Sequence, residues 1–326
     1  MTYELGIDLG GTKILAGVVD VGTGKILSHE KKRTRAKHTA GDIVDRLILA
    51  AKGAIDESGV NPHEIERVGI GVAGQIDREN GIVINGPNLA HMQNMPLAEK
   101  VSAALGKPVY LYNDVEAAAA GEAAFGAAKG QPDFVVIFVG TGIGGAIYHD
   151  GDPYTGATAT AGEIGHTTVD ENGRICSCGG LGHLEAYASR TAIVRYILAQ
   201  MKAGRQSVLR DVADEIDPDD PGGSGIRSSA LSKALEDGDA LTKEALALGA
   251  DYLAAGLSSV VNFYNPPLII LGGGLVGAID WFFERVSMRT REKSLMVPRQ
   301  SLRIEKAALE DFSGIVGAAV LAARAG

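Results

Sequence analysis

The sequence predicts an α/β protein built from two similar domains. The chain has 326 residues, which is long for one hydrophobic core. Two apolar segments, 5–9 and 134–139, each run into a glycine–threonine turn and then into a second strand-like segment. Because this pattern begins twice, about one domain apart, we expect two domains of related construction. Hydrophobic residues make up 45% of the chain, which suits a tightly packed α/β protein.

The first half of the chain alternates between strands and helices. The expected antiparallel strands cover 3–9, 14–19 and 26–35, separated by turns at 10–11 and 21–24. Apolar spacing and glycine or proline stops then predict further elements. These are helices over 43–59, 97–105 and 116–129 and strands over 68–72 and 109–112.

The second half restarts the pattern. A strand, a glycine turn and a second strand cover 134–149, and a further strand, 268–271, ends in another glycine cluster. The polar stretch 217–225 predicts a long loop. We expect a small N-terminal α/β domain over 1–115, joined by the C-terminal helix 312–326, and a larger α/β domain over 116–311. Since no linker of disordered composition separates them, a hinge is expected.

Charge and composition exclude several classes of protein. The net charge is −9 and the Lys and Arg residues are scattered, so nucleic acid is not expected as a binding partner. The basic run 31–33, with Arg35, is expected to be a solvated strand face. No apolar stretch approaches the roughly 20 residues that span a bilayer, and the N-terminus enters a strand without a signal peptide. The two cysteines, Cys176 and Cys178, are too close for an ordinary disulfide framework. We expect a cytoplasmic enzyme without a membrane partner.

The two glycine turns predict phosphate binding. Glycine lets the backbone take positive φ, so that main-chain N–H groups can face an anion. One such hairpin is weak evidence, but two suggest domains that grip one polyphosphate from either side. Asp8 ends the first strand beside its turn, where a carboxylate either holds Mg²⁺ or caps the turn.

Asn113 and Asp114 lie where a strand ends and a helix begins, which is where open α/β sheets collect ligands. One interpretation is a helix N-cap. Another is catalysis, because a single carboxylate can orient an alcohol and accept its proton during phosphoryl transfer. The two interpretations are compatible.

A cluster of potential metal ligands follows. A Cys-x-Cys pair bracketed by histidines predicts a tetrahedral Cys₂His₂ zinc site, the alternative being a loop with incidental ligands. The four residues are His166, Cys176, Cys178 and His183.

Together these elements resemble the ROK family of repressors, open reading frames and sugar kinases, over essentially the whole chain. The matching motifs are 8–13, Asn113-Asp114, 140–145, 161–166, 176–185 and 271–274. The resemblance implies two actin-like (ribonuclease H-like) α/β domains with a cleft between them. It also implies ATP, Mg²⁺, a structural Zn²⁺ and a homodimer or dimer of dimers. One position departs, because the family usually has a third cysteine where this chain has His183.

The resemblance also implies the role of each residue. Asp114 is expected to be the catalytic general base. The sugar contacts implied are Gly74, Asn88, Asn113, Asp114, Glu163, His166 and Glu185. The nucleotide contacts implied are Asp8, Gly10, Gly11, Thr12, Lys13, Gly140, Thr141, Gly142, Gly272, Gly273 and Gly274.

The segments 86–89 and 95–97 are similar to bacterial glucokinases within the family, so glucose is the leading acceptor. Fructose, mannose, allose and N-acetylmannosamine remain alternatives, as does polyphosphate as the donor. Two other classes are weighed. A sugar-sensing repressor needs a helix-turn-helix before the first hairpin. The hairpin begins at Tyr3, so the repressor is the more distant alternative. An actin- or chaperone-like ATPase would not need the sugar and zinc signature.

Overall fold

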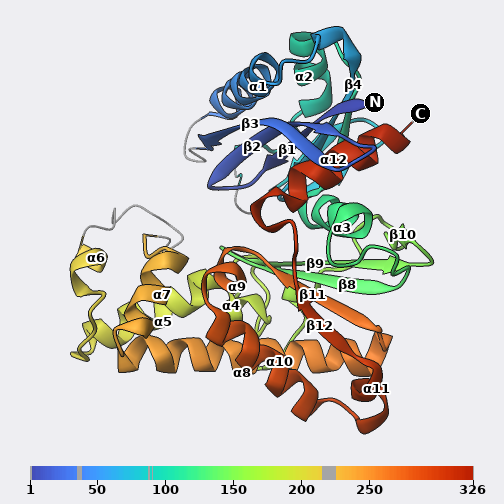
Figure 1. Ribbon diagram of the computed structural model, residues 1–326. Coiled ribbons are helices and arrows are strands. Elements are labelled where there is room, and N and C mark those ends of the chain that lie inside the picture. Colours follow the sequence, from blue (N-terminus) through green and yellow to red (C-terminus); the bar gives the residue numbers. More distant parts are fainter. Residues whose placement is uncertain (1, 35–38, 87–88, 90, 215–224, 326) are drawn as a thin grey trace. The chain divides into compact units, whose positions relative to one another are not determined.

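The computed structural model describes residues 2–34, 39–86, 89, 91–214 and 225–325 (Figure 1). Contacts divide the chain into two compact units. The first unit comprises Met1–Pro132, Ala146–Thr160 and Ala307–Gly326, and the second comprises Asp133–Gly145 and Ala161–Lys306. The segment 116–132, which the sequence analysis assigned to the second domain, therefore packs with the first unit. The expected loop 217–225 lies almost entirely outside the described residues, and so does Arg35.

A five-stranded sheet of order β3-β2-β1-β4-β7 forms the centre of the first unit. Its strands are β1 (Tyr3–Leu9), β2 (Lys13–Asp20), β3 (Lys25–Arg33), β4 (Ile65–Val72) and β7 (Val109–Asn113). The first three strands pair antiparallel, whereas β4 runs parallel to both β1 and β7. A separate two-stranded sheet pairs β5 (Gln75–Asp77) with β6 (Ile82–Asn85).

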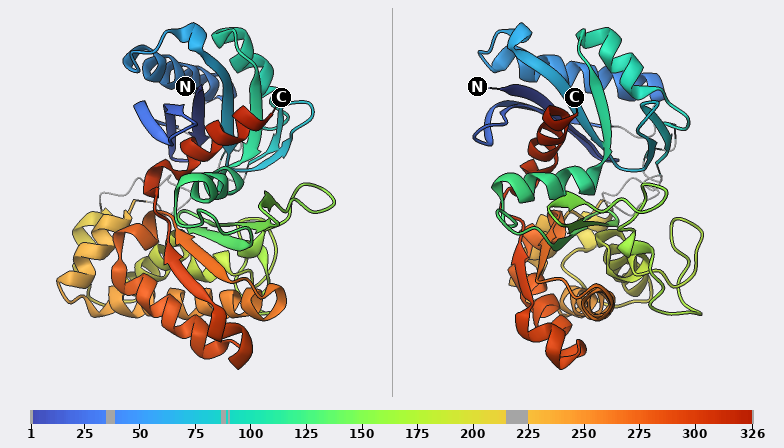
Figure 2. Two further views of the ribbon diagram at one scale, coloured as in Figure 1. Left: turned by 45° about the vertical axis from the view of Figure 1, so that its right-hand side comes forward. Right: turned by 90° about the vertical axis from the view of Figure 1, so that its right-hand side faces the viewer.

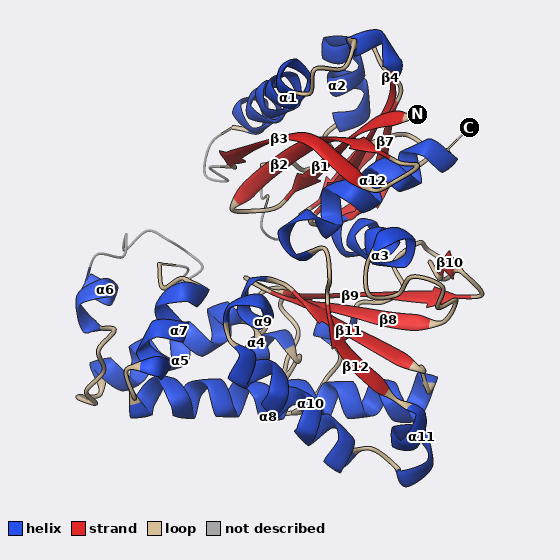
Figure 3. Ribbon diagram, in the orientation of Figure 1, coloured by secondary structure: helices blue, strands red, loops and turns tan. Residues whose placement is uncertain are grey.

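Helices cover the first sheet (Figure 3). Helix α1 (Ala40–Glu57) begins with a capping box at Thr39 and buries its apolar stripe against β2 and β3. Helices α2 (Leu97–Leu105), α3 (Asp114–Phe125) and α12 (Ser313–Arg324) complete the unit, with a 3₁₀ turn at Pro62–Glu64.

Helix α12, the C-terminal helix, lies along β1 and β4 (Figure 2). Glycines in the strands permit the close approach, since a Cβ on Gly6 would lie 1.8 Å from the Ile315 carbonyl oxygen. A Cβ on Gly69 would lie 2.0 Å from the oxygen of Ala318. The end of the chain is therefore a central element of the first unit.

A second five-stranded sheet has the order β10-β9-β8-β11-β12. Its strands are β8 (Phe134–Val139), β9 (Ile143–His149), β10 (Asp152–Pro153), β11 (Leu268–Gly272) and β12 (Arg303–Lys306). Strand β11 runs parallel to β8 and β12. The strand–turn–strand patterns expected around both glycine turns are confirmed.

The remaining helices belong to the second unit. They are α4 (Glu185–Ala188), α5 (Arg190–Lys202), α6 (Arg210–Asp214), α7 (Ser228–Glu236), α8 (Ala240–Tyr264), α9 (Gly274–Ala278), α10 (Asp280–Lys293) and α11 (Met296–Ser301). Two 3₁₀ turns lie elsewhere in the chain, at Ile164–His166 in this unit and at Glu310–Phe312 in the first.

Helix α8 corrects one expectation from the sequence. Among the described residues it is the one helix long and apolar enough to span a membrane, with 25 residues and a mean hydropathy of 1.3 in its apolar window. Half of that window is buried inside the protein. Asp251, in the middle of α8, also accepts hydrogen bonds from Arg285 and Arg289 of α10 at 2.8 and 3.2 Å. The helix therefore serves as the core helix of the second unit.

Candidate active site and metal cluster

The sheet register of the first unit gathers three strand ends at one edge. Leu9 of β1 pairs with Val72 of β4, and Val72 pairs with Asn113 of β7. Because the three strands are parallel, their carboxyl ends carry Asp8 and Asp114 to the same edge of the sheet. Gly71 of β4 permits the close approach of Asp114 to this edge, since a Cβ on Gly71 would lie 3.3 Å from Cα of Asp114.

Asn113 is the N-cap of α3. Its side-chain oxygen accepts hydrogen bonds from the N–H groups of Val115 at 3.0 Å and Glu116 at 3.2 Å. Asp114 is then the first helical residue, and its Oδ1 lies 3.0 Å from the same Val115 nitrogen. The capping interpretation is thus confirmed for Asn113, and it leaves a half-buried Asp114 carboxylate at the helix N-terminus.

The first glycine turn, Gly10-Gly11-Thr12, is closed by a hydrogen bond from Gly10 N to the Lys13 carbonyl at 3.0 Å. Lys13 then forms an ion pair with Asp311, Nζ to Oδ1, at 3.1 Å. Burial raises the pKa of Asp8 to about 6; Lys13 opposes this increase and Asp311 adds to it. A carboxylate held in this way gains from a nearby cation, so Asp8 fits a Mg²⁺ ligand.

The second glycine turn, Gly140-Thr141-Gly142, receives contacts from distant parts of the second unit. Glu185 Oε2 accepts a hydrogen bond from Ile143 N at 2.8 Å. Arg190 donates from its main chain to Gly140 O at 2.9 Å and from Nη2 to Thr141 Oγ1 at 3.1 Å.

Only some of the clustered glycines have the positive φ that was expected from the sequence. Neither Gly10 nor Gly142 has a positive φ. Gly142 is needed for close approach, since a Cβ there would lie 2.3 Å from Glu185 Oε2. Gly273 in the third cluster, 272–274, does have a φ of 85°, and a Cβ there would lie 2.6 Å from the Val139 carbonyl oxygen. The third cluster therefore adjoins the strand that leads into the second turn.

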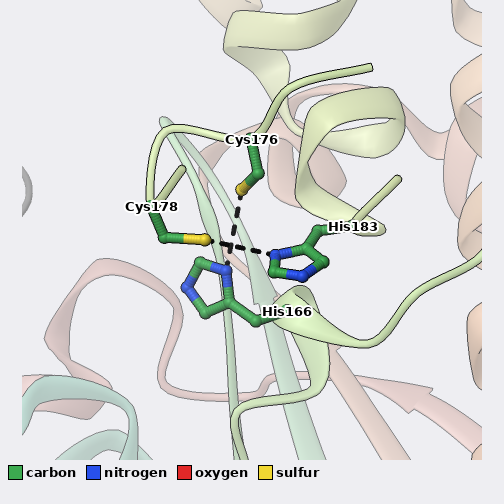
Figure 4. Close-up of side chains that lie close together, drawn as sticks. All are labelled: His166, Cys176, Cys178 and His183. Carbon is green, nitrogen blue, oxygen red and sulfur yellow. Dashed lines mark hydrogen bonds between the residues drawn. The ribbon is translucent and has the colours of Figure 1, made fainter. Parts of the chain in front are cut away.

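Four predicted metal ligands come together in the second unit (Figure 4). Their donor atoms all lie within 4.8 Å of one another. Sγ of Cys176 is 3.7 Å from Nδ1 of His166, and Sγ of Cys178 is 3.2 Å from Nδ1 of His183. A tetrahedral Zn²⁺ with ordinary bond lengths separates sulfur and nitrogen ligands by about 3.6 Å. The donor set therefore fits zinc.

A tight loop, residues 176–183 and called the knuckle below, presents three of these ligands. Cys176 N donates to Gly180 O at 2.8 Å, and Gly179 N donates to Cys176 O at 2.9 Å. Gly182 has a φ of 66°, and a Cβ there would lie 1.5 Å from the Asp170 carbonyl oxygen, so only glycine fits. Burial raises the pKa of the Cys176 thiol, and a bound cation would oppose that rise.

The predicted sugar contacts of the second unit adjoin this cluster. His166 directs Nδ1 toward Cys176, while its Nε2 lies 3.9 Å from Oε2 of Glu163. The second oxygen of Glu185, Oε1, accepts a hydrogen bond from Ser177 Oγ in the knuckle at 2.8 Å.

The other predicted sugar contacts belong to the first unit. Asn113 and Asp114 share the sheet edge described above. Gly74 has a packing role, because a Cβ there would lie 2.3 Å from the Asn85 carbonyl oxygen. Asn88 lies outside the described residues.

Arg190 and Asp311 were not among the functional residues predicted from the sequence. Arg190 follows a serine cap at the start of a helix. A cation is electrostatically unfavourable at that position, so this placement was the one signal in the sequence that could have indicated a functional role. Asp311 had no distinguishing pattern, because its contact with Lys13 joins opposite ends of the chain.

Comparisons with known proteins agree with these motifs. The sequence model of the ROK family matches residues 4–325. A glucokinase of Streptomyces coelicolor is 37% identical, over 99% of this chain and 98% of that protein. A glucokinase of Thermotoga maritima is 34% identical, over 97% and 95%. The crystal structure of a ROK family glucokinase from Streptomyces griseus, in complex with glucose and AMPPNP, superposes with a TM-score of 0.87 and 35% identity over 99% of this chain and 100% of that one. This chain belongs to the ROK family.

Proposed function

We propose that this protein is an ATP-dependent hexokinase that phosphorylates glucose to glucose 6-phosphate. The carrying observation is likeness over the full length to glucokinases, together with a solved relative that holds glucose and AMPPNP. The residues that the reaction requires are present at both glycine turns and at the Asn113-Asp114 strand end.

Asp114 acts as the general base. It would accept the proton of the sugar hydroxyl as that oxygen attacks the terminal phosphorus of ATP. The bond from this phosphorus to the bridging oxygen would break, and ADP would leave. The Asn113 cap supports this role, because it fixes the start of α3 and with it the Asp114 backbone. Asp8 would hold Mg²⁺ in the proposed site, and the ion would supply positive charge to the phosphate oxygens.

Each unit contains proposed sugar and nucleotide contacts. In the first unit the sugar contacts are Asn113, Asp114 and Asn88, and the phosphate contacts come from 10–13. In the second unit the sugar contacts are Glu163, His166 and Glu185, and the phosphate contacts come from 140–142. Carboxylates and amides together supply the acceptors and donors that sugar hydroxyls need. The third glycine cluster, 272–274, is assigned to the adenosine.

The Cys₂His₂ cluster is assigned to a structural zinc ion. Four protein donors leave no open position, so the ion would activate no water. Its role would be to hold the knuckle against Glu185 and to fix the His166 ring, whose Nε2 then points toward Glu163.

The function is tested by a coupled assay over a sugar panel, with ATP and then polyphosphate as donor. Glucose with ATP should give the highest kcat/KM. Higher activity on fructose, mannose, allose or N-acetylmannosamine would replace glucose as the acceptor. Nucleotide hydrolysis without any sugar requirement would instead favour the actin- or chaperone-like ATPase.

Two further properties complete the proposal. A cytoplasmic location is supported by the use of ATP and by two cysteines that form no disulfide. A homodimer or dimer of dimers is supported by the frequency of symmetric enzymes and by exposed apolar side chains. These are Phe263, Leu295, Met296 and Val297, exposed by 93%, 64%, 62% and 71%. Sedimentation that showed only a monomer at working concentration would contradict it.

A further inference from the structure

The two glycine turns differ in how charge is supplied to them. The first turn is followed directly by Lys13, whose ammonium lies beside Asp8 and Asp311. The second turn is followed by Ile143 at the corresponding place. A turn that binds a polyphosphate needs donors and positive charge, and the second turn brings no cation in its own strand.

The carboxylate beside the second turn makes this need greater. Glu185 Oε2 accepts the Ile143 N–H at 2.8 Å and lies against Gly142. An anion brought to this turn would meet a negative charge at close range, in a partly buried place where screening is weak.

Arg190 lies against the same turn, although 49 residues separate it from Thr141. Its main-chain N–H donates to Gly140 O at 2.9 Å, and its Nη2 donates to Thr141 Oγ1 at 3.1 Å. The residue is half-buried. Its main chain is fixed at the turn by the first contact, and its guanidinium is held there by the second.

The place of Arg190 in its helix also points to a task other than helix stability. It is the first residue of α5, directly after the Ser189 cap, whose side chain accepts from Ala192 N. A helix N-terminus carries partial positive charge, so a cation there opposes the helix dipole. The arrangement concentrates positive charge beside the second turn, where it offsets the charge of Glu185.

We propose that Arg190 binds the polyphosphate of the nucleotide at the second glycine turn while holding Thr141 in place. The planar guanidinium forms paired hydrogen bonds to phosphate oxygens, which an ammonium does not. The inference rests on the proposed kinase function, and it names a nucleotide contact that the family motifs did not assign.

Three substitutions distinguish the role of the Arg190 charge in phosphate binding from its role in holding Thr141 in place. Arg190→Lys keeps the charge, Arg190→Gln keeps a donor for Thr141 without charge, and Arg190→Ala keeps neither. Titration calorimetry with AMPPNP, ADP and adenosine then reads phosphate binding apart from base binding. We expect Arg190→Gln and Arg190→Ala to weaken AMPPNP binding at least tenfold, or about 1.4 kcal/mol. Arg190→Lys should retain part of the lost affinity. Adenosine and glucose affinity should change less than twofold.

Arg195→Ala is the matched control, since it removes an exposed arginine from the same helix. It should leave AMPPNP affinity unchanged. AMPPNP affinity in Arg190→Gln equal to that of the parent would overturn the proposal, as would an equal loss for adenosine. If Arg190→Ala does not fold, the Lys and Gln variants still decide. A parent protein that neither binds AMPPNP nor phosphorylates glucose would instead refute the proposed function.

Discussion

The carboxylate of Glu185 accepts a hydrogen bond from the Ile143 main-chain N–H at 2.8 Å, although 42 residues separate the two in sequence. Its other oxygen accepts from Ser177 Oγ, also at 2.8 Å. One side chain thus ties the second glycine turn to the knuckle. Sugar binding, nucleotide binding and the metal cluster are therefore expected to be coupled in the second unit.

Glu185→Ala should weaken the binding of both glucose and ATP. Its loss leaves the Ile143 N–H without its acceptor and removes a proposed sugar contact. We expect KM to rise about tenfold or more for glucose and severalfold for ATP, since a lost hydrogen bond to a charged group is worth about 1.5–3 kcal/mol. Steady-state kinetics check this, with Glu163→Ala as the comparison, because the exposed Glu163 has no contact with the turn among the described residues. A Glu185→Ala variant whose KM for ATP is unchanged would contradict the coupling.

Asp114→Asn should abolish transfer while glucose still binds. The amide retains a hydrogen bond to the acceptor hydroxyl but cannot take its proton, and loss of a general base typically costs about 10²–10⁴-fold in rate. The measurement is kcat together with equilibrium glucose affinity. Near-normal turnover would show that another group is the base.

Asp8→Asn should make the protein more stable and inactive. The folded-state pKa of Asp8 is about 6, above its ordinary 3.8, so folding disfavours the charged form. The penalty is fully present above pH 6 and disappears as the pH falls toward 4. At pH 7.5, two pKa units correspond to at most about 3 kcal/mol, and we expect about 1–3.

Urea unfolding of metal- and nucleotide-free protein between pH 5 and 8 measures this effect. The advantage of Asp8→Asn over the parent should shrink as the pH is lowered through 6. Asp56→Asn, an equal substitution on the exposed face of α1, should show no such trend. An advantage that grows toward pH 5 would have the wrong sign and would refute the argument.

The sequence predicted the strands and turns well because their signals are local. Strand β1 matches the expected range 3–9, since an apolar run met a glycine turn within a few residues. The clustering of the two cysteines and two histidines was also predicted, because 18 residues contain all four. Long-range partners carried no local signal. The contact of Glu185 with Ile143 depends on how α4 packs against the second turn, and that of Arg190 with Thr141 on how α5 does. The sequence near each residue does not encode this packing.

Glu122 shows the same limit and gives a stability prediction. This fully buried carboxylate accepts hydrogen bonds from three main-chain N–H groups and one hydroxyl, those of Ala127, Ala308, Leu309 and Ser313. It therefore joins α3 to the segment that leads into α12. Glu122→Ala leaves these donors buried without an acceptor, at about 1–3 kcal/mol for each.

We expect Glu122→Ala to lose at least about 3 kcal/mol or to fail to fold, and Glu122→Gln to lose less, because one acceptor oxygen remains. Thermal unfolding of the Gln variant is the primary measurement. Glu79→Gln, at an exposed site, should be within about 0.5 kcal/mol of the parent. Equal melting temperatures for the two Gln variants would show that the buried carboxylate is dispensable.

His183 provides the most specific test of the metal assignment. Its Nδ1 lies 3.2 Å from Cys178 Sγ, as expected for two ligands of one ion. His183→Ala should lower the zinc content from near one per chain to well below that. It should also weaken glucose binding, because the knuckle that supports Glu185 loosens. Acid should compete for the site, since both imidazoles must be neutral to bind. Elemental analysis and glucose titration of the parent and variant decide it, with exposed His63→Ala as the control. Full zinc content in His183→Ala, or none in the parent, would refute the assignment.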